Sequence, residues 1–195
     1  DAPVRVRTLV RGLDYDWDFA GSIGDRFWFT TNKGAPKGRL VSTDVTAARP
    51  VFTPVVAQTA DTLVAASLVG KRLIVAYLGD AKSQADLFEL DGKRVGAVAL
   101  PDIGTASGFA GKTGDTESFY TFTSFAVPPT VYRYDSATNT STPFFAPKLA
   151  FEPALYRTDQ VFYASKDGTR IPMFVVRRKD LPAGPQPTLL YGYGG

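Results

Sequence analysis

The sequence contains no histidine and no cysteine, and both absences limit the chemistry open to it. Without cysteine there is no disulfide framework and no thiolate to act as nucleophile or ligand. Without histidine, these 195 residues cannot assemble a Ser-His-Asp catalytic triad on their own. A histidine-based metal site is excluded too, and no cluster of carboxylates with ligand spacing replaces it. We therefore expect neither a metal nor a cofactor.

Charge of one sign and long apolar runs are missing as well. The chain has 22 lysine and arginine residues against 19 aspartate and glutamate residues, and the two signs are interspersed. The only short basic cluster is Arg177, Arg178 and Lys179, and Asp180 follows it at once. A nucleic-acid-binding protein gathers its basic residues on one face, so we expect no nucleic-acid partner. No apolar run approaches the roughly 18 residues of a membrane-spanning helix, so we expect no membrane partner.

What the sequence does have is a repeat of segments rich in aromatic and aliphatic residues. Aromatic residues make up 13% of the chain and favour strands. Three similar runs, residues 26–32, 72–78 and 118–124, each follow a turn that contains glycine. The runs begin at residues 26, 72 and 118, so 46 residues separate each from the next. An interval of this size is typical of one blade of a β-propeller.

Each run belongs to a unit of four predicted strands. The predicted strands are residues 15–21, 26–31, 38–44 and 50–56 in the first unit, 62–68, 72–78, 85–90 and 94–100 in the second, and 105–110, 118–124, 130–135 and 141–147 in the third. A single four-stranded sheet cannot bury both of its apolar faces, whereas neighbouring blades in a ring cover them. A β-sandwich with evenly spaced strands is the alternative, but its Greek-key connections vary in length. The fold class expected for this region is therefore mainly β, a partial β-propeller of about three blades.

Three blades do not close a ring, because propellers have about 4–8 of them. We therefore expect further blades upstream of this sequence. Residues 4–10 alternate apolar and polar side chains, and we predict that they are the closing strand of an earlier blade. The first residues show neither an initiator methionine nor a signal-peptide pattern, and we interpret them as an internal start.

The repeat stops after residue 147. Residues 160–165 are predicted to form a strand, residues 166–169 a turn with a strong Asp-Gly signal, and residues 170–177 a returning strand. Pro172 places the returning strand at a sheet edge or near a strand start. Residues 179–187 are predicted to form a polar, proline-rich loop.

The last residues combine a short apolar run with a glycine-rich loop. Residues 188–191 are predicted to form a strand buried on both faces, and glycine occupies positions 192, 194 and 195. A strand that leads into a glycine-rich loop is the arrangement of the oxyanion loop in α/β-hydrolases. A plain transition from strand to loop, with no chemistry, is the alternative.

These segments resemble the prolyl oligopeptidase family. Residues 161–174, VFYASKDGTRIPMF, are similar to the strand, turn and strand that open the family's hydrolase domain. Residues 190–195, LYGYGG, match its Tyr-Gly-Tyr-Gly-Gly motif, and residues 115–125 are similar to its last propeller blade. The resemblance implies that residues 1–147 are the C-terminal blades of a seven-bladed β-propeller. It also implies that residues 148–195 are the start of an α/β-hydrolase peptidase domain.

The resemblance also implies a function. It implies a serine-type endopeptidase that cleaves short peptides on the carboxyl side of proline, with the propeller gating access to the active site. Tyr193 would donate its phenol O–H to the oxyanion of the tetrahedral intermediate, whereas we interpret Tyr191 as structural. Because the nucleophilic serine, the aspartate and the histidine are absent, we expect this chain alone to be inactive. We interpret Ser67, Ser107 and Ser165 as structural.

Two alternatives remain open at this point. The first is an oligopeptidase of the same family that cleaves after basic residues. The second is a non-enzymatic propeller that only binds partners, which explains residues 1–147 equally well but not the residues that follow. The expected partners are short proline-containing peptides and the remainder of the same polypeptide. We expect a monomer that works in the cytoplasm, with the periplasm as the alternative.

Overall fold

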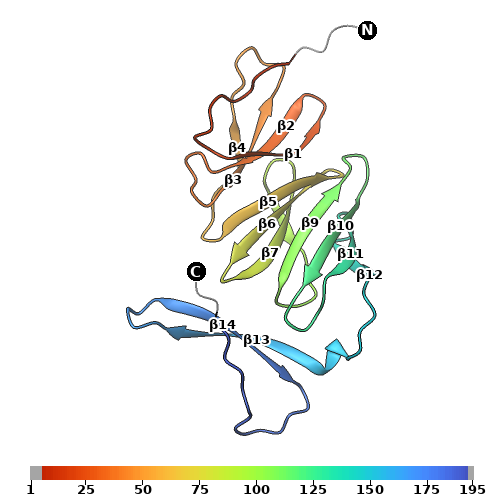
Figure 1. The fold of residues 1–195 in the computed structure, drawn as a ribbon. Coiled ribbons are helices and arrows are strands. Elements are labelled where there is room, and N and C mark those ends of the chain that lie inside the picture. The colour runs from red at the N-terminus through yellow and green to blue at the C-terminus, as the bar shows by residue number, and fades with distance from the viewer. Residues whose placement is uncertain (1–5, 193–195) are drawn as a thin grey trace.

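The computed structural model describes residues 6–192, which form three four-stranded antiparallel sheets and one two-stranded sheet (Figure 1). The strands of the first blade are β1 (Trp17–Ile23), β2 (Arg26–Thr31), β3 (Arg39–Asp44) and β4 (Thr53–Val56). Those of the second blade are β5 (Thr62–Val69), β6 (Arg72–Gly79), β7 (Lys82–Phe88) and β8 (Arg94–Ala97). Those of the third blade are β9 (Thr105–Gly111), β10 (Glu117–Thr123), β11 (Thr130–Asp135) and β12 (Thr140–Phe145).

Within each blade the strands lie side by side in the order in which they follow along the chain. This up-and-down order is that of a propeller blade. The first strands of the three blades, β1, β5 and β9, also lie next to one another where successive blades meet (Figure 1). The prediction of a mainly β protein with three propeller-like blades is therefore confirmed.

A buried apolar cluster joins the first blade to the second. Trp28 and Leu40 of the first blade lie in it with Leu73 and Val75 of the second, and each of the four is almost completely buried. Burial of each such side chain contributes on the order of 1.5–3 kcal/mol. Packing between sheets, and not the hydrogen bonds within one sheet, therefore holds successive blades together.

A second cluster joins the second blade to the third. Ile74 and Leu87 of the second blade lie in this cluster with Phe109, Tyr120 and Phe122 of the third. Successive side chains of a strand point to opposite faces. Ile74 therefore faces the third blade, while its neighbours on β6 face the first. The continuous apolar run of β6 follows from this burial on both faces.

The structure corrects the predicted position of β7. We predicted a strand at residues 85–90, but β7 spans Lys82–Phe88. The hairpin between β6 and β7 turns on only two residues, Asp80 and Ala81, because Gly79 pairs with Lys82. Both turn residues have positive φ, 49° and 60°, as a type I′ turn requires. Alanine is an uncommon choice at such a position, so the sequence did not indicate the turn.

The structure also shows that the repeat does not extend to side-chain direction. Ile74 and Tyr120 are 46 residues apart, yet both lie in the cluster between the second and third blades, so they face each other from opposite sides. Because side chains alternate along a strand, the run in the third blade is one residue out of step with the run in the second blade in the face that it presents. The loop before β10 also differs in length, since six residues separate Gly111 from its partner Ser118, whereas two separate Val69 from its partner Arg72.

A separate hairpin follows the blades. It begins with a 3-10 turn, η1 (Pro153–Leu155), and consists of β13 (Tyr156–Ala164) and β14 (Arg170–Arg178), which pair with each other and with no blade. Its turn has Gly168 at a φ of 83°, in agreement with the Asp-Gly signal. Pro172 lies on an edge strand, as predicted, although β13 begins four residues earlier than the predicted strand at 160.

Two other predicted strands are wrong. Residues 188–192 are irregular, and Leu189, Leu190 and Tyr191 are 91%, 82% and 80% exposed instead of buried. A strand needs a neighbour to pair its backbone groups, and no strand in the described part of the chain lies beside this segment. Residues 6–10 are also irregular, while residues 4 and 5 of that predicted strand lie outside the described residues.

The hydrolase interpretation of residues 148–195 stays a prediction. Among residues 6–192, η1 is the only helical element and every pair of strands is antiparallel, so the layers of an α/β fold are not part of what the structure describes. No helix within this range is long and apolar enough to cross a membrane.

Candidate functional site

The residue predicted to act in catalysis, Tyr193, lies outside the described residues. The structure describes only the segment that leads to it. Residues 188–192 run without regular structure into solvent, and the Tyr191 side chain is exposed. The interpretation of Tyr193 as an oxyanion-hole donor therefore stays a prediction.

The base of the hairpin determines where this segment starts. The backbone N–H of Lys179 donates a hydrogen bond of 2.8 Å to the carbonyl of Leu155, which closes the hairpin at its open end. Arg178 donates two hydrogen bonds to the carboxylate of Asp180, at 2.9 Å and 2.6 Å. This guanidinium holds the pKa of Asp180 below its usual value. The proline-rich loop thus begins at residues that these hydrogen bonds hold to the base of the hairpin.

The interpretation of three serines as structural stays a prediction. Ser67 lies on β5, Ser107 on β9 and Ser165 in the turn between β13 and β14. Within residues 6–192 no group of three or more acidic side chains is arranged to hold a metal ion.

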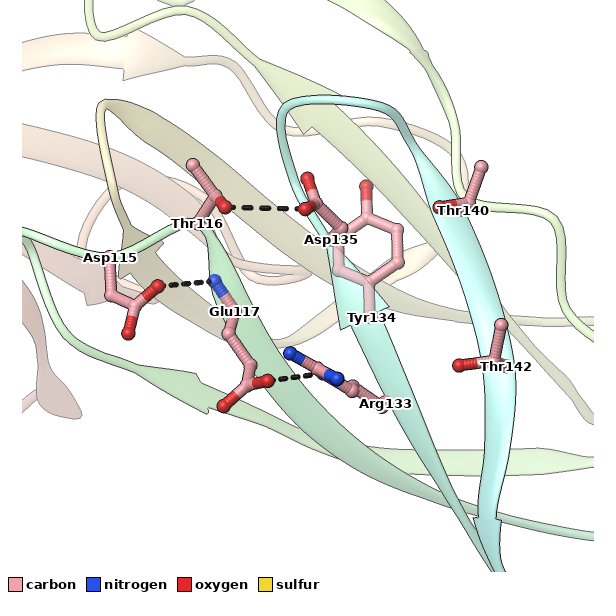
Figure 2. A pocket seen from close by; sticks show the side chains of 8 residues that line it. All are labelled: Asp115, Thr116, Glu117, Arg133, Tyr134, Asp135, Thr140 and Thr142. Atoms are coloured by element: carbon pink, nitrogen blue, oxygen red, sulfur yellow. Dashed lines mark hydrogen bonds and ion pairs between the residues drawn. The ribbon is translucent and has the colours of Figure 1, made fainter.

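One polar hollow of about 330 Å³ lies at the end of the third blade (Figure 2). It is formed where β10 begins, where β11 ends and where β12 begins. Its lining residues are Asp115, Thr116, Glu117, Arg133, Tyr134, Asp135, Thr140 and Thr142.

The charged groups around this hollow are already engaged with one another. Glu117 forms an ion pair with Arg133 on the neighbouring strand. Asp115 Oδ1 accepts a hydrogen bond of 3.1 Å from the backbone N–H of Glu117, and Thr116 Oγ1 donates one of 3.3 Å to Asp135 Oδ2 (Figure 2). These contacts join the turn before β10 to the end of β11, so they stabilise the blade.

The carboxylate of Asp135 is unsuited to proton transfer near neutral pH. Its Oδ1 accepts backbone hydrogen bonds from Ala137 at 2.8 Å and from Thr138 at 3.1 Å. Hydrogen bonds from Thr138 and Ala137 to the charged form lower the pKa of Asp135, so the group stays ionised. A general acid or base works best with a pKa near the working pH. We therefore assign this hollow a structural role.

A set of contacts that the sequence did not indicate lies between the hairpin and the blades. Gln160 and Arg170 of the hairpin contact Asp80, which is in the turn between β6 and β7. Phe174 of β14 packs against Phe125, which follows β10. These partners are 49 to 90 residues apart in the sequence, and no local sequence pattern connects them. The only signal in the sequence was the Asp-Gly turn of the hairpin itself.

The comparisons with known proteins agree with the repeat. Residues 1–147 match the family described as the prolyl oligopeptidase N-terminal beta-propeller domain. The prolyl endopeptidase of Elizabethkingia meningoseptica is 36% identical over 189 residues, which are 96% of this chain but 27% of that protein. The dual function macrocyclase-peptidase POPB of Galerina marginata is 28% identical over 199 residues, 98% of this chain and 27% of that protein. The chain thus spans about a quarter of the length of these relatives.

Solved structures show the same arrangement of strands. A prolyl endopeptidase structure covers 89% of this chain with a TM-score of 0.83 at 46% identity, and the match is 25% of that chain. The apo structure of prolyl oligopeptidase B from Galerina marginata covers 90% with a TM-score of 0.82 at 25% identity, and the match is 26% of that chain. The chain therefore belongs to the prolyl oligopeptidase family, whose N-terminal β-propeller domain is the part that its first 147 residues match.

Proposed function

We propose that this chain is a segment of a serine-type endopeptidase that cleaves short peptides on the carboxyl side of proline. The observation that carries the proposal is the combination, in one chain, of a family-matched propeller region with the Tyr-Gly-Tyr-Gly-Gly sequence at residues 191–195. Two of its relatives are named prolyl endopeptidase, which supports the peptidase class and the preference for proline.

The boundary between the two halves is part of the proposal. We place the last propeller blades at residues 1–147 and the start of an α/β-hydrolase domain at residues 148–195. The hairpin supports this boundary, because β13 and β14 pair only with each other and do not extend any blade. A fourth blade would instead have required a four-stranded meander after residue 147.

The first blade supports the proposal that the remainder of the same polypeptide is a partner. Its outer face, turned away from the second blade, carries a cluster of packed aromatic rings: Trp17, Phe19, Phe27, Phe29 and Phe52. Phe19 is 56% exposed. Exposed contiguous apolar surface of this kind marks an interaction site. An additional blade would cover it in the way that the second blade covers the opposite face.

The proposed role of Tyr193 follows from the chemistry of acyl transfer. Hydrolysis of a peptide bond develops negative charge on the carbonyl oxygen, and a phenol O–H held on a glycine-rich loop can donate to it. A preorganised donor of this kind is worth about 2.7–4 kcal/mol in comparable sites. The nucleophile, base and orienting acid would come from the rest of the polypeptide, so the present chain alone should be inactive. The monomeric state and the cytoplasmic location stay predictions.

The experiment uses the longer polypeptide that contains this segment. Short peptides with proline, lysine or arginine before the scissile bond are compared as substrates, and Tyr193→Phe is compared with Tyr191→Phe. We expect cleavage after proline, with kcat lowered about 10²–10³-fold by Tyr193→Phe at similar KM. Tyr191→Phe is the matched control and should retain activity.

Each alternative has its own outcome. Preferential cleavage after lysine or arginine would move the protein to the basic-specific branch of the family. Absence of hydrolysis from the complete polypeptide would favour a propeller that only binds partners. Unchanged turnover of Tyr193→Phe would remove the tyrosine from the mechanism while leaving the peptidase assignment intact.

A further inference from the structure

A second polar hollow, of about 350 Å³, lies at the end of the first blade, where β2 begins, β3 ends and β4 begins. Among the residues that line it are Arg26, Ser42, Asp44, Arg49 and Thr53. Strand pairing sets Arg26 opposite Asp44 and Ser42 opposite Thr53. Directly paired residues project to the same face of a sheet, so these four side chains share one face of the blade. Arg49 reaches the hollow from the loop between β3 and β4.

The guanidinium of Arg26 is held in place, yet no carboxylate pairs with it. Its Nε and Nη2 donate hydrogen bonds of 3.3 Å and 2.9 Å to Ser42 Oγ, and its central carbon lies 5.4 Å from the centroid of the Trp28 ring. Within residues 6–192 neither Arg26 nor Arg49 forms an ion pair, although Asp44 lies directly opposite Arg26. Two cationic groups at this hollow are therefore available to an anion.

The other two blades pair their arginines at the same end. Arg72 begins β6, 46 residues after Arg26 begins β2, and it forms an ion pair with Glu89. In the hollow of the third blade, Arg133 forms an ion pair with Glu117 (Figure 2). The unpaired arginine is thus a property of the first blade and not of the repeat.

Asp44 and Ser42 add an acceptor and a neutral donor. Asp44 Oδ1 accepts hydrogen bonds from the Thr46 backbone N–H at 2.7 Å and from its hydroxyl at 2.6 Å. The hydroxyl and the N–H of Thr46 lower the pKa of Asp44, so this carboxylate is charged near neutral pH. Ser42 is 2% exposed, and within residues 6–192 its hydroxyl accepts from Arg26 but donates to no group. The hollow therefore offers donors on one side and a charged acceptor on the other.

We propose that this hollow of the first blade binds inorganic phosphate, with Arg26 and Arg49 as charged donors, Ser42 as a neutral donor and Asp44 as the acceptor of the proton that the phosphate keeps.

The charged acceptor selects phosphate among the oxyanions. Guanidinium groups pair with the oxygens of carboxylates and phosphates alike, so the arginines alone do not choose between them. Inorganic phosphate keeps at least one proton near neutral pH and can donate it to Asp44. Sulfate and carboxylates have no proton to donate at this pH, and a phosphate monoester has lost most of its own. Each of these would face the charge of Asp44 without a hydrogen bond.

The test is a calorimetric titration of the longer polypeptide that contains this segment with inorganic phosphate. It is made at about pH 7.5 and low ionic strength, because salt screens exposed charges. We expect saturable binding, weakened about tenfold by Arg26→Gln and about threefold by Arg49→Gln. Arg49 is exposed, so its variant tests the site even where Arg26→Gln disturbs the fold. Arg72→Gln is the matched control and should leave binding unchanged, since the Arg72 guanidinium already pairs with Glu89.

Sulfate and O-phosphoserine test the role of Asp44. The native chain should bind each about tenfold more weakly than inorganic phosphate, because each meets the carboxylate without a proton. Asp44→Asn keeps an oxygen for Thr46 and adds an amide N–H donor, so phosphate and sulfate should then bind within about twofold of each other.

Three outcomes would overturn the proposal. They are the absence of saturable phosphate binding, an equal loss from Arg72→Gln and Arg26→Gln, and equal affinity of the native chain for phosphate and sulfate. The titration uses no peptide substrate, so none of these outcomes bears on the proposed peptidase function.

Discussion

The hydroxyl of Tyr134 donates a hydrogen bond of 2.9 Å to Oδ1 of Asn139, and so joins the end of β11 to the turn that follows it. The amide Nδ2 of the same asparagine donates a hydrogen bond of 2.9 Å to the carbonyl of Ala97 in the second blade. The φ of Asn139 is 53°, a conformation that asparagine adopts more readily than most residues. One side chain thus satisfies a buried phenol and also joins two blades.

Tyr134 and Tyr77 offer a matched comparison. Both rings are buried, but the Tyr77 hydroxyl has no hydrogen-bond partner among residues 6–192. Tyr134→Phe should lower the free energy of unfolding by about 0.5–1.5 kcal/mol, because it leaves Asn139 without its donor. Tyr77→Phe should change it by less than about 0.5 kcal/mol or increase it, since it removes an unpaired hydroxyl. Urea unfolding of both variants measures the difference, and equal losses would contradict the assigned hydrogen bond.

The same two tyrosines predict loss of stability at high pH. Burial raises the pKa of Tyr77 to about 12, and the charge of Asp86 adds to the effect. Burial also raises the pKa of Tyr134 to about 12, and the charge of Asp135 adds to it. In the unfolded chain the pKa of a tyrosine is 10.0. Between these values only the unfolded state loses the proton, so stability is complete below pH 10 and falls as the pH rises towards 12. The expected slope is about 1.4 kcal/mol per pH unit for each tyrosine.

Circular dichroism during urea unfolding at a series of pH values checks this slope. Tyr77→Phe should reduce the alkaline loss of stability, because the substituted ring has no proton to lose, while stability at pH 7 stays within about 0.5 kcal/mol of the native value or rises. A variant that loses stability as steeply as the native chain would show that other groups govern the alkaline transition.

The sequence indicated the blades more reliably than their details. The 46-residue interval and the Gly-containing turns predict three four-stranded units, because blade length and turn chemistry are local properties. The position of β7 was missed, because its turn depends on Asp80 and Ala81, where alanine gives no turn signal. The 46-residue interval did not indicate which blade a side chain faces, since Ile74 and Tyr120 face each other across the boundary between the second and third blades.

The candidate site could be predicted only as far as short motifs extend. The hairpin turn at Gly168 was visible because Asp-Gly specifies its geometry locally. The contacts of Asp80 with Gln160 and Arg170 join residues 80 and 90 positions apart, and pairing at such separations follows from the fold as a whole. The buried strand predicted at residues 188–191 failed for the same reason, since burial requires neighbours that the motif does not contain.

Two glycines test how closely the first and second blades approach. Gly92 and Gly24 both have positive φ, 92° and 55°. A Cβ at Gly92 would lie 1.9 Å from the carbonyl oxygen of Val55 in the first blade, whereas a Cβ at Gly24 would meet nothing within 4 Å. Gly24→Ala should therefore cost only the conformational penalty of about 1–2 kcal/mol. Gly92→Ala should cost about 1–3 kcal/mol more, because backbone must move. Similar midpoints in urea would contradict this close approach.

The two faces of the first blade predict different consequences of removing an aromatic ring. Trp28 is 1% exposed and lies in the cluster shared with the second blade, whereas Phe19 of β1 is 56% exposed on the outer aromatic face. Trp28→Ala should lower the free energy of unfolding by about 3–5 kcal/mol, as large-to-small changes in a core do. Phe19→Ser should change it by less than about 1 kcal/mol, but should reduce the binding of an apolar dye and the self-association of the chain, since it breaks the exposed patch. Urea unfolding measures the first effect, and dye fluorescence with light scattering measures the second.

Strong destabilisation by Phe19→Ser, with dye binding unchanged, would contradict this assignment. It would show that the outer face is part of the core of this chain and is not a surface that a further blade covers.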